Sequence, residues 1–133
     1  MRLFEETRST NPVRVLLVDD EMALGVTLAR AMGEKYEMVC ETSTRDALNR
    51  LEQDADFDAI LCDLNMPGDS GMVLYEKLAT QWPGLERRVV FITGGSYDDC
   101  TSRFLSEVPN SCLEKPFDIS TLEKMLPHPD PGT

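Results

Sequence analysis

One stretch, VRVLLVDDE at residues 13–21, does most to decide the fold. Residues 13–18 are almost entirely apolar, which predicts a strand that is buried on both faces. Strands of this kind occur in parallel sheets with helices on both sides. Three acids follow without a spacer, so Asp19, Asp20 and Glu21 are expected at the carboxyl end of this strand.

Short apolar runs alternate with helical patterns along the rest of the chain. The other runs predicted as strands are 36–41, 59–62, 88–92 and 111–113. Helical patterns occupy 21–33 and 96–105, and others begin at Ser43, after Gly71 and at Asp118. Gly33 is predicted as a C-cap, Ser43 with Asp46 as a capping box, and Asp118 as an N-cap. Five β-α units with short connections imply an α/β fold in which helices cover both faces of a parallel sheet.

Composition excludes several classes of protein. The chain has 133 residues, about the size of one domain, with 24 acidic and 13 basic side chains and a net charge of −11. Nucleic acids and anionic membrane surfaces attract clustered Lys and Arg, so neither is expected as a direct partner. No apolar stretch approaches the length of a membrane span, and residues 1–12 contain no apolar run that could serve as a secretory signal.

The four cysteines, Cys40, Cys62, Cys100 and Cys112, show no metal-binding or redox spacing. Three of them lie inside apolar runs, which predicts small core residues in a reducing, cytoplasmic compartment. The single histidine, His128, lies in a Pro-rich stretch. A zinc site and a Ser-His or Cys-His nucleophile are therefore not expected.

Polar residues at the strand ends are the candidate site, because open α/β sheets bind ligands beyond the carboxyl ends of their strands. Those ends supply Asp19 and Asp20, Asp63, Thr93 and Lys115. Three converging carboxylates repel one another, and a divalent cation held by oxygen ligands, Mg²⁺, would relieve the conflict. One carboxylate is then free as a nucleophile, while the lysine and the hydroxyl stabilise phosphoryl oxygens. The set suits phosphoryl transfer onto an aspartate.

Each of these residues also has an ordinary structural interpretation. The acidic pair could stabilise a helix N-terminus, and Asp63 could cap a turn. Thr93 could be a plain strand residue, and Lys115 a solvated lysine before a proline. The functional interpretation rests on all of them falling at strand ends together.

These residues resemble the receiver domain of two-component response regulators, from Val13 to about Leu126. The resemblance rests on VLLVDDE at 15–21, LCDLNMPG at 61–68, FITGG at 91–95 and EKPF at 114–117. It implies a flavodoxin-like, doubly wound sheet of five parallel strands in the order 2-1-3-4-5 with five helices. Residues 1–12 are then a polar leader or linker, 13–126 the receiver domain and 127–133 a Pro-rich tail.

The resemblance also implies roles for the strand-end residues. Asp63 would be the phosphoacceptor, and Mg²⁺ would be held by Asp19, Asp20, Asp63 and the backbone carbonyl of Asn65. Thr93 would be the switch hydroxyl, and Lys115 would bind the phosphoryl group, with a cis bond to Pro116. The donor would be a phosphohistidine on a histidine kinase or a phosphotransfer domain. The receiver would catalyse its own phosphorylation and dephosphorylation, so it is not a conventional enzyme.

Cys112 departs from the family, which usually has Tyr or Phe three residues before the lysine. A thiol cannot replace the rotation of an aromatic ring, so we expect output to rely on the loop at residues 94–97, with Tyr97 as the moving aromatic. The alternative is that Cys112 simply fills the core. Asn65 and Gly95 flank the approach of attacking water and are expected to tune the lifetime of the phosphoryl group.

Several alternatives stay open at this point. The domain is either a stand-alone regulator or part of a hybrid histidine kinase, with the polar leader and Pro-rich tail favouring the second. A small Mg²⁺-dependent phosphatase of the haloacid dehalogenase type is a different class, but it would need an acid where Asn65 stands. A pseudo-receiver that only binds partners is a third. A homodimer is left open, since the helix at 96–105 shows no clear self-complementary stripe.

Overall fold

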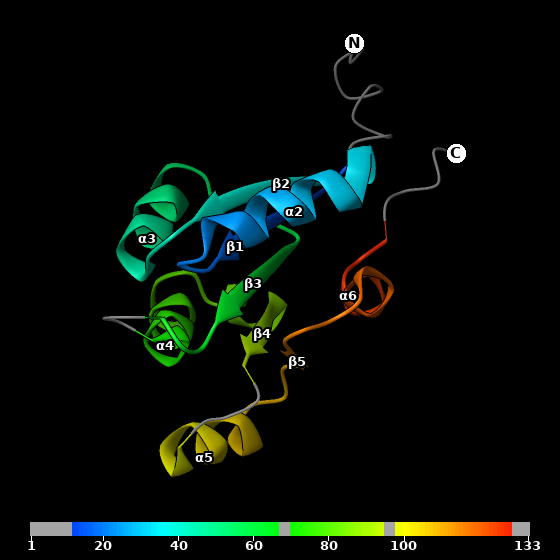
Figure 1. Cartoon of the computed structure of the whole chain (residues 1–133). Helices are drawn as coiled ribbons and strands as arrows, with labels where there is room; N and C mark the ends of the chain where they lie inside the picture. The colour runs from blue at the N-terminus through cyan, green and yellow to red at the C-terminus, as the bar shows by residue number, and fades with distance from the viewer. Residues whose placement is uncertain (1–11, 67–69, 95–97, 129–133) are drawn as a thin grey trace.

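The computed structural model describes residues 12–66, 70–94 and 98–128. Its sheet has five parallel strands in the order β2-β1-β3-β4-β5 (Figure 1). The strands are β1 (Val13–Val18), β2 (Tyr36–Glu41), β3 (Ala59–Asp63), β4 (Val89–Thr93) and β5 (Cys112–Glu114). The predicted fold class and strand order are therefore confirmed.

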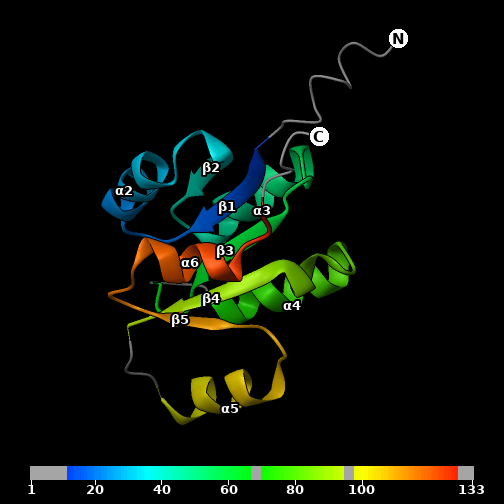
Figure 2. The same ribbon diagram turned by 90° about the vertical axis from the view of Figure 1, so that its right-hand side faces the viewer.

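Five α-helices in the described ranges connect and cover these strands. They are α2 (Met22–Met32), α3 (Thr44–Gln53), α4 (Gly71–Gln81), α5 (Asp99–Glu107) and α6 (Ile119–Met125). Two short 3₁₀ turns, η1 (Gly33–Lys35) and η2 (Leu85–Arg88), precede β2 and β4. Figure 2 shows α6 and α4 on opposite sides of the sheet and α5 at its far edge, beyond β5.

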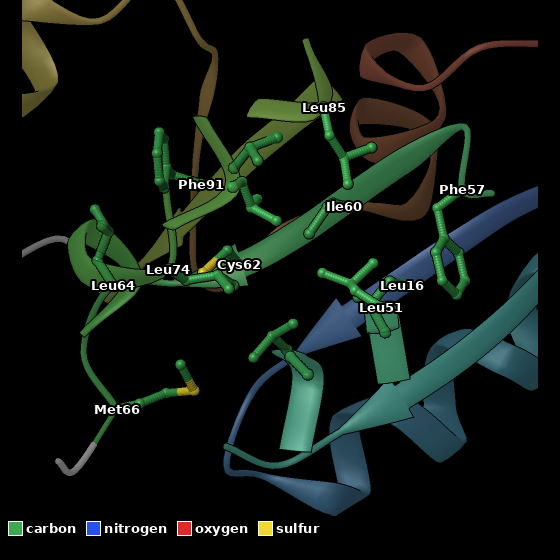
Figure 3. Close-up of a cluster of buried hydrophobic side chains, with 14 residues drawn as sticks. Leu16, Leu51, Phe57, Ile60, Cys62, Leu64, Met66, Leu74, Leu85 and Phe91 are labelled. Atoms are coloured by element: carbon green, nitrogen blue, oxygen red, sulfur yellow. The ribbon is translucent and has the colours of Figure 1, made fainter. Parts of the chain in front are cut away.

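Alternation along the strands divides the core into two clusters, one on each face. One cluster takes Leu16, Cys62 and Phe91 from the sheet and packs them against α3 and α4 (Figure 3). The other takes Leu17 and Leu61 and packs them against α2 and α6. Burial on both faces explains why the strands read as continuous apolar runs.

Local signals set the ends of most helices. The side chain of Ser43 accepts a hydrogen bond from Asp46 N, as predicted, and Gly33 follows α2 with a φ of 71°. Asp98 caps α5 through Thr101 N, so this helix begins later than the predicted 96. Asp118 does occupy the N-cap position of α6, but its side chain makes no capping hydrogen bond.

The prediction that the cysteines in apolar runs are core residues is wrong for two of the three. Cys62 is buried, whereas Cys40 and Cys112 are exposed, as is Cys100. Cys40 lies on β2 and Cys112 on β5, and these are the two edge strands of the sheet. A side chain on an edge strand is covered only if a helix reaches that far, which the local sequence does not reveal.

The sheet places the carboxyl ends of β1, β3, β4 and β5 at one edge of the domain, because all neighbouring pairs are parallel. The residues that follow these strands are thereby brought together from distant positions in the chain. Among the described helices, none has the length and apolar character needed to cross a membrane.

Candidate functional site

The predicted site residues do gather at the carboxyl ends of the strands. Asp19 directly follows β1, Asp63 and Thr93 are the last residues of β3 and β4, and Lys115 directly follows β5. Asp19, Asp63 and Thr93 are buried, Lys115 is partly buried, and Asp20 is exposed. The fold therefore buries the carboxylates of Asp19 and Asp63 and the hydroxyl of Thr93. It leaves Asp20 exposed to solvent.

Lys115 connects the acids of the cluster. Its Nζ donates a hydrogen bond to Asp19 Oδ2 at 2.9 Å and lies 3.6 Å from Asp63 Oδ2. Glu21 Oε1 is also 3.6 Å away, although its side chain is largely exposed. One ammonium group thus faces three carboxylates, so the cluster keeps an excess of negative charge.

Backbone hydrogen bonds fix these side chains. Asp19 Oδ1 accepts from Glu21 N at 2.9 Å, and Asp63 Oδ1 accepts from Asn65 N at 2.8 Å. Lys115 N donates to Thr93 O at 2.7 Å, which attaches the residue after β5 to the end of β4. The bond between Lys115 and Pro116 is cis, as the family resemblance implied.

The electrostatics of the cluster distinguish its two central groups. Burial raises the pKa of Asp63, and the neighbouring Asp19 and Asp20 add to this, against the opposing effects of Asn65 N–H and Lys115. Partial burial works against the charge of Lys115, but Asp19, Asp63 and Glu21 outweigh it and raise the pKa of the lysine. The lysine therefore stays charged, while the negative charge of Asp63 is disfavoured.

The donor atoms of the cluster fit a hard divalent cation. Carboxylate oxygens of Asp19, Asp20 and Asp63 all lie within 4.8 Å of one another. Oxygen-only donors favour Mg²⁺ over softer metals, and a divalent charge would offset the repulsion that raises the pKa of Asp63. Asn65 lies beside this cluster and is exposed, but the role of its carbonyl as a ligand stays a prediction.

Two further predictions concern the output of the site. Cys112 is exposed on β5, so the interpretation that it fills the core is wrong. Gly94 is exposed at the end of β4. Gly95 and Tyr97, which belong to the predicted tuning position and output loop, lie outside the described residues.

Two contributors to the site were absent from the predicted set. Glu21 was noted only as an acid after β1, yet it is the third carboxylate near Lys115. The sequence places Gly71 only just before a helical pattern, yet it begins α4 in close contact with residues 62–64. The available signal was a glycine at the predicted start of a helix.

Comparisons with known proteins identify the class. Residues 15–127 match the response regulator receiver domain, and the chain belongs to this family. It is 30% identical over 117 residues to the nitrate/nitrite response regulator protein NarL of Escherichia coli K12, covering 86% of this chain and 53% of NarL. It is 28% identical over 119 residues to the virulence sensor protein BvgS of Bordetella pertussis, covering 86% of this chain and 10% of BvgS.

Solved structures agree on the fold. The non-phosphorylated HemR receiver domain from Leptospira biflexa superposes with a TM-score of 0.69 at 26% identity, covering 85% of this chain and 90% of that one. The chemotaxis protein CheY4 of Vibrio cholerae gives a TM-score of 0.72 at 23% identity, covering 86% and 99%. The chain spans from about a tenth to about half the length of the curated relatives it matches. What it shares with them is the receiver domain of two-component signalling.

Proposed function

We propose that this receiver accepts a phosphoryl group from a phosphohistidine onto Asp63, with Mg²⁺ at the acidic cluster, and signals by a change of conformation. The observation that carries the proposal is the cluster itself. Three carboxylates lie within 4.8 Å of one another, and Lys115 Nζ is 2.9 Å from Asp19 and 3.6 Å from Asp63. One phosphorus atom could thus lie within reach of three groups: the Asp63 carboxylate as nucleophile, a metal ion at the acidic cluster, and the Lys115 ammonium group.

The side chains divide the work according to their contacts. Asp63 Oδ1 is occupied by the Asn65 N–H, so we assign Oδ2, which faces Lys115, as the oxygen that bonds to phosphorus. As this bond forms, the phosphorus–nitrogen bond breaks and the electron pair stays on the donor imidazole. Lys115 then neutralises a phosphoryl oxygen, and the Thr93 hydroxyl at the end of β4 donates to another. Bound Mg²⁺ would supply positive charge to the carboxylates and the phosphoryl oxygens.

The proposal implies a partner and a location. The donor is a histidine kinase or a histidine phosphotransfer domain, and the domain works in the cytoplasm, consistent with its four free cysteines. Its net charge of −11 favours protein partners over nucleic acid. An origin in a hybrid histidine kinase and the formation of a homodimer stay predictions.

The test is phosphorylation by a small acyl-phosphate donor with Mg²⁺, followed by intact mass spectrometry. We expect one added phosphoryl group, loss of that group in Asp63→Asn, and its retention in Asp58→Asn, which removes an exposed acid at the other end of the sheet. Multiple turnover of unrelated phosphomonoesters would instead indicate a phosphatase. An unmodified wild-type protein would indicate a pseudo-receiver.

A further inference from the structure

Gly71 is the first residue of α4 and lies directly against the end of β3. A Cβ atom placed on this glycine would lie 2.9 Å from the backbone oxygen of Asp63, 3.0 Å from Cys62 Sγ and 3.2 Å from Leu64 Cδ2. All three neighbours belong to residues 62–64. The start of α4 therefore lies against the backbone of the candidate phosphoacceptor, and no room is left between them for a β-carbon.

The reason for a glycine here is space rather than backbone conformation. The glycines with positive φ in the described residues are Gly33 and Gly84, and Gly71 is not among them. Any residue could adopt its backbone angles, but a β-carbon would collide with a main-chain oxygen. A main-chain atom, unlike the end of a long side chain, cannot rotate away from the added carbon.

Neither side of this contact is free to withdraw. On the strand side, Leu64 N donates to Ile92 O at 2.9 Å, which attaches the residue after Asp63 to β4. On the helix side, Leu74 N donates to Ser70 O at 3.2 Å, and the side chain of Leu74 is buried in the core cluster that includes Cys62 (Figure 3). An added methyl group must therefore shift the strand end, the first turn of α4, or both.

We infer that Gly71 is a positioning residue for the Asp63 carboxylate, an inference that rests on the proposed function of that carboxylate. By letting α4 pack against the Asp63 backbone, it fixes Asp63 Oδ2 at 3.6 Å from Lys115 Nζ and within the group of three acids. A displacement of a few tenths of an ångström at the backbone changes both relations at once. Gly71 has no side chain with which to touch a phosphoryl group, so we assign its effect to the position of the Asp63 backbone.

The test compares Gly71→Ala with Gly25→Ala, a matched control. Gly25 is also a buried helical glycine, and it lies in α2, on the opposite face of the sheet. Its added Cβ would lie 2.7 Å from Cys40 Sγ. For both variants, the phosphorylation rate constant at saturating acyl-phosphate donor, the half-saturating donor concentration, the Mg²⁺ dissociation constant and Tm are measured. The Mg²⁺ titration uses the metal alone and calorimetric detection.

For Gly71→Ala we expect a rate constant at least about ten-fold lower, since misplacement of about 1 Å can cost about 100-fold. We also expect weaker Mg²⁺ binding and a half-saturating donor concentration within about two-fold of wild type. Gly25→Ala should keep a rate constant and a Mg²⁺ affinity within about two-fold of wild type, because its added Cβ meets side-chain atoms of Cys40 and Leu17 and no main-chain atom of a site residue. Equal rate constants and equal Mg²⁺ affinities in Gly71→Ala and wild type would overturn the inference.

A second variant separates the contact with the Cys62 thiol from the other two close contacts. In Gly71→Ala combined with Cys62→Ala, the contact with the thiol is relieved but the 2.9 Å contact with Asp63 O remains. The rate constant should stay low. Full recovery would assign the effect to crowding of the thiol and would overturn the role of the Asp63 backbone. If wild type takes up no phosphoryl group, the proposed function fails, while the Mg²⁺ affinities of the two single variants still decide the role of Gly71.

Discussion

The two ends of the sheet each gather acids around one cation, and they differ in burial. At the amino end, Arg14 Nη1 donates to Asp54 at 2.9 Å, its Nε to Glu37 at 3.4 Å, and its backbone N to Asp58 at 2.8 Å. The side chains of Asp54 and Glu37 are 47% and 50% exposed. At the carboxyl end, the side chains of Asp19 and Asp63 are 0% and 7% exposed.

Burial gives the two groups of acids opposite electrostatic character. A hydrogen bond from Asp56 N and another from Arg14 lower the pKa of Asp54, so its negative charge is stabilised. Burial and neighbouring acids raise the pKa of Asp63, so its negative charge is opposed. An acidic cluster becomes a candidate site where its charge is buried and only partly compensated, and not merely where acids are numerous.

The largest difference between the two ends of the sheet is expected when the cationic side chain at each end is replaced. Lys115→Met takes away the group that faces Asp63 Oδ2, so its phosphorylation rate constant should fall about 100-fold, the usual loss for one transition-state donor. Phosphorylation is followed by mass spectrometry with a small acyl-phosphate donor. A rate constant within two-fold of wild type would show that the lysine does not act on the phosphoryl group.

Arg14→Met is the corresponding change at the amino end. Arg14 bonds the Asp56 carbonyl at 2.7 Å and lies 4.5 Å above the Phe57 ring, in addition to its acidic partners. Because these contacts are partly exposed, we expect the free energy of unfolding to fall by about 1 kcal/mol, measured with urea. The phosphorylation rate constant should not change. A large loss of phosphorylation in this variant would mean that the two ends are not independent.

A change of pH is expected to have a smaller effect on stability, with opposite signs at the two ends of the sheet. Between the ordinary carboxyl pKa and the raised pKa of Asp63, the folded chain binds more protons than the unfolded chain, so stability falls as pH rises. With a chelator present, Asp63→Asn should therefore raise Tm at pH 7 and have no such advantage below the ordinary carboxyl pKa. For Asp54, whose pKa is lowered, stability is present above the ordinary carboxyl pKa and is lost as pH falls. Asp54→Asn should therefore lower Tm at pH 7, and Tm shifts of the same sign in both variants would contradict the comparison.

Most of the fold could be predicted from the sequence because the strands are buried on both faces and so are nearly continuous apolar runs. The strand order followed from the family resemblance. Burial on the edge strands could not be predicted, as Cys40 and Cys112 show, because it depends on how far the covering helices extend. The start of α5 depended on which acid caps it, and Asp98 does so.

The candidate site was largely predictable because parallel strands end at one edge of the sheet, and the chain carries polar residues there. The sequence distinguished Asp63, which follows a predicted strand, from Asp54, which precedes it, but it did not reveal how differently the two side chains are buried. The position of Glu21 near Lys115 depends on the approach of the end of β5 to the end of β1, which leaves no local pattern. The close contact of Gly71 with β3 leaves only a glycine at the predicted start of a helix.

Calorimetric titration with Mg²⁺ tests the central claim most directly, because it asks which end of the sheet holds a cation. We expect wild type and Asp54→Asn to bind one Mg²⁺ with the same affinity, and Asp19→Asn to lose most of that affinity. Undiminished binding in Asp19→Asn, or loss of binding in Asp54→Asn, would contradict the assignment of the carboxyl-end cluster as the metal and phosphoacceptor site.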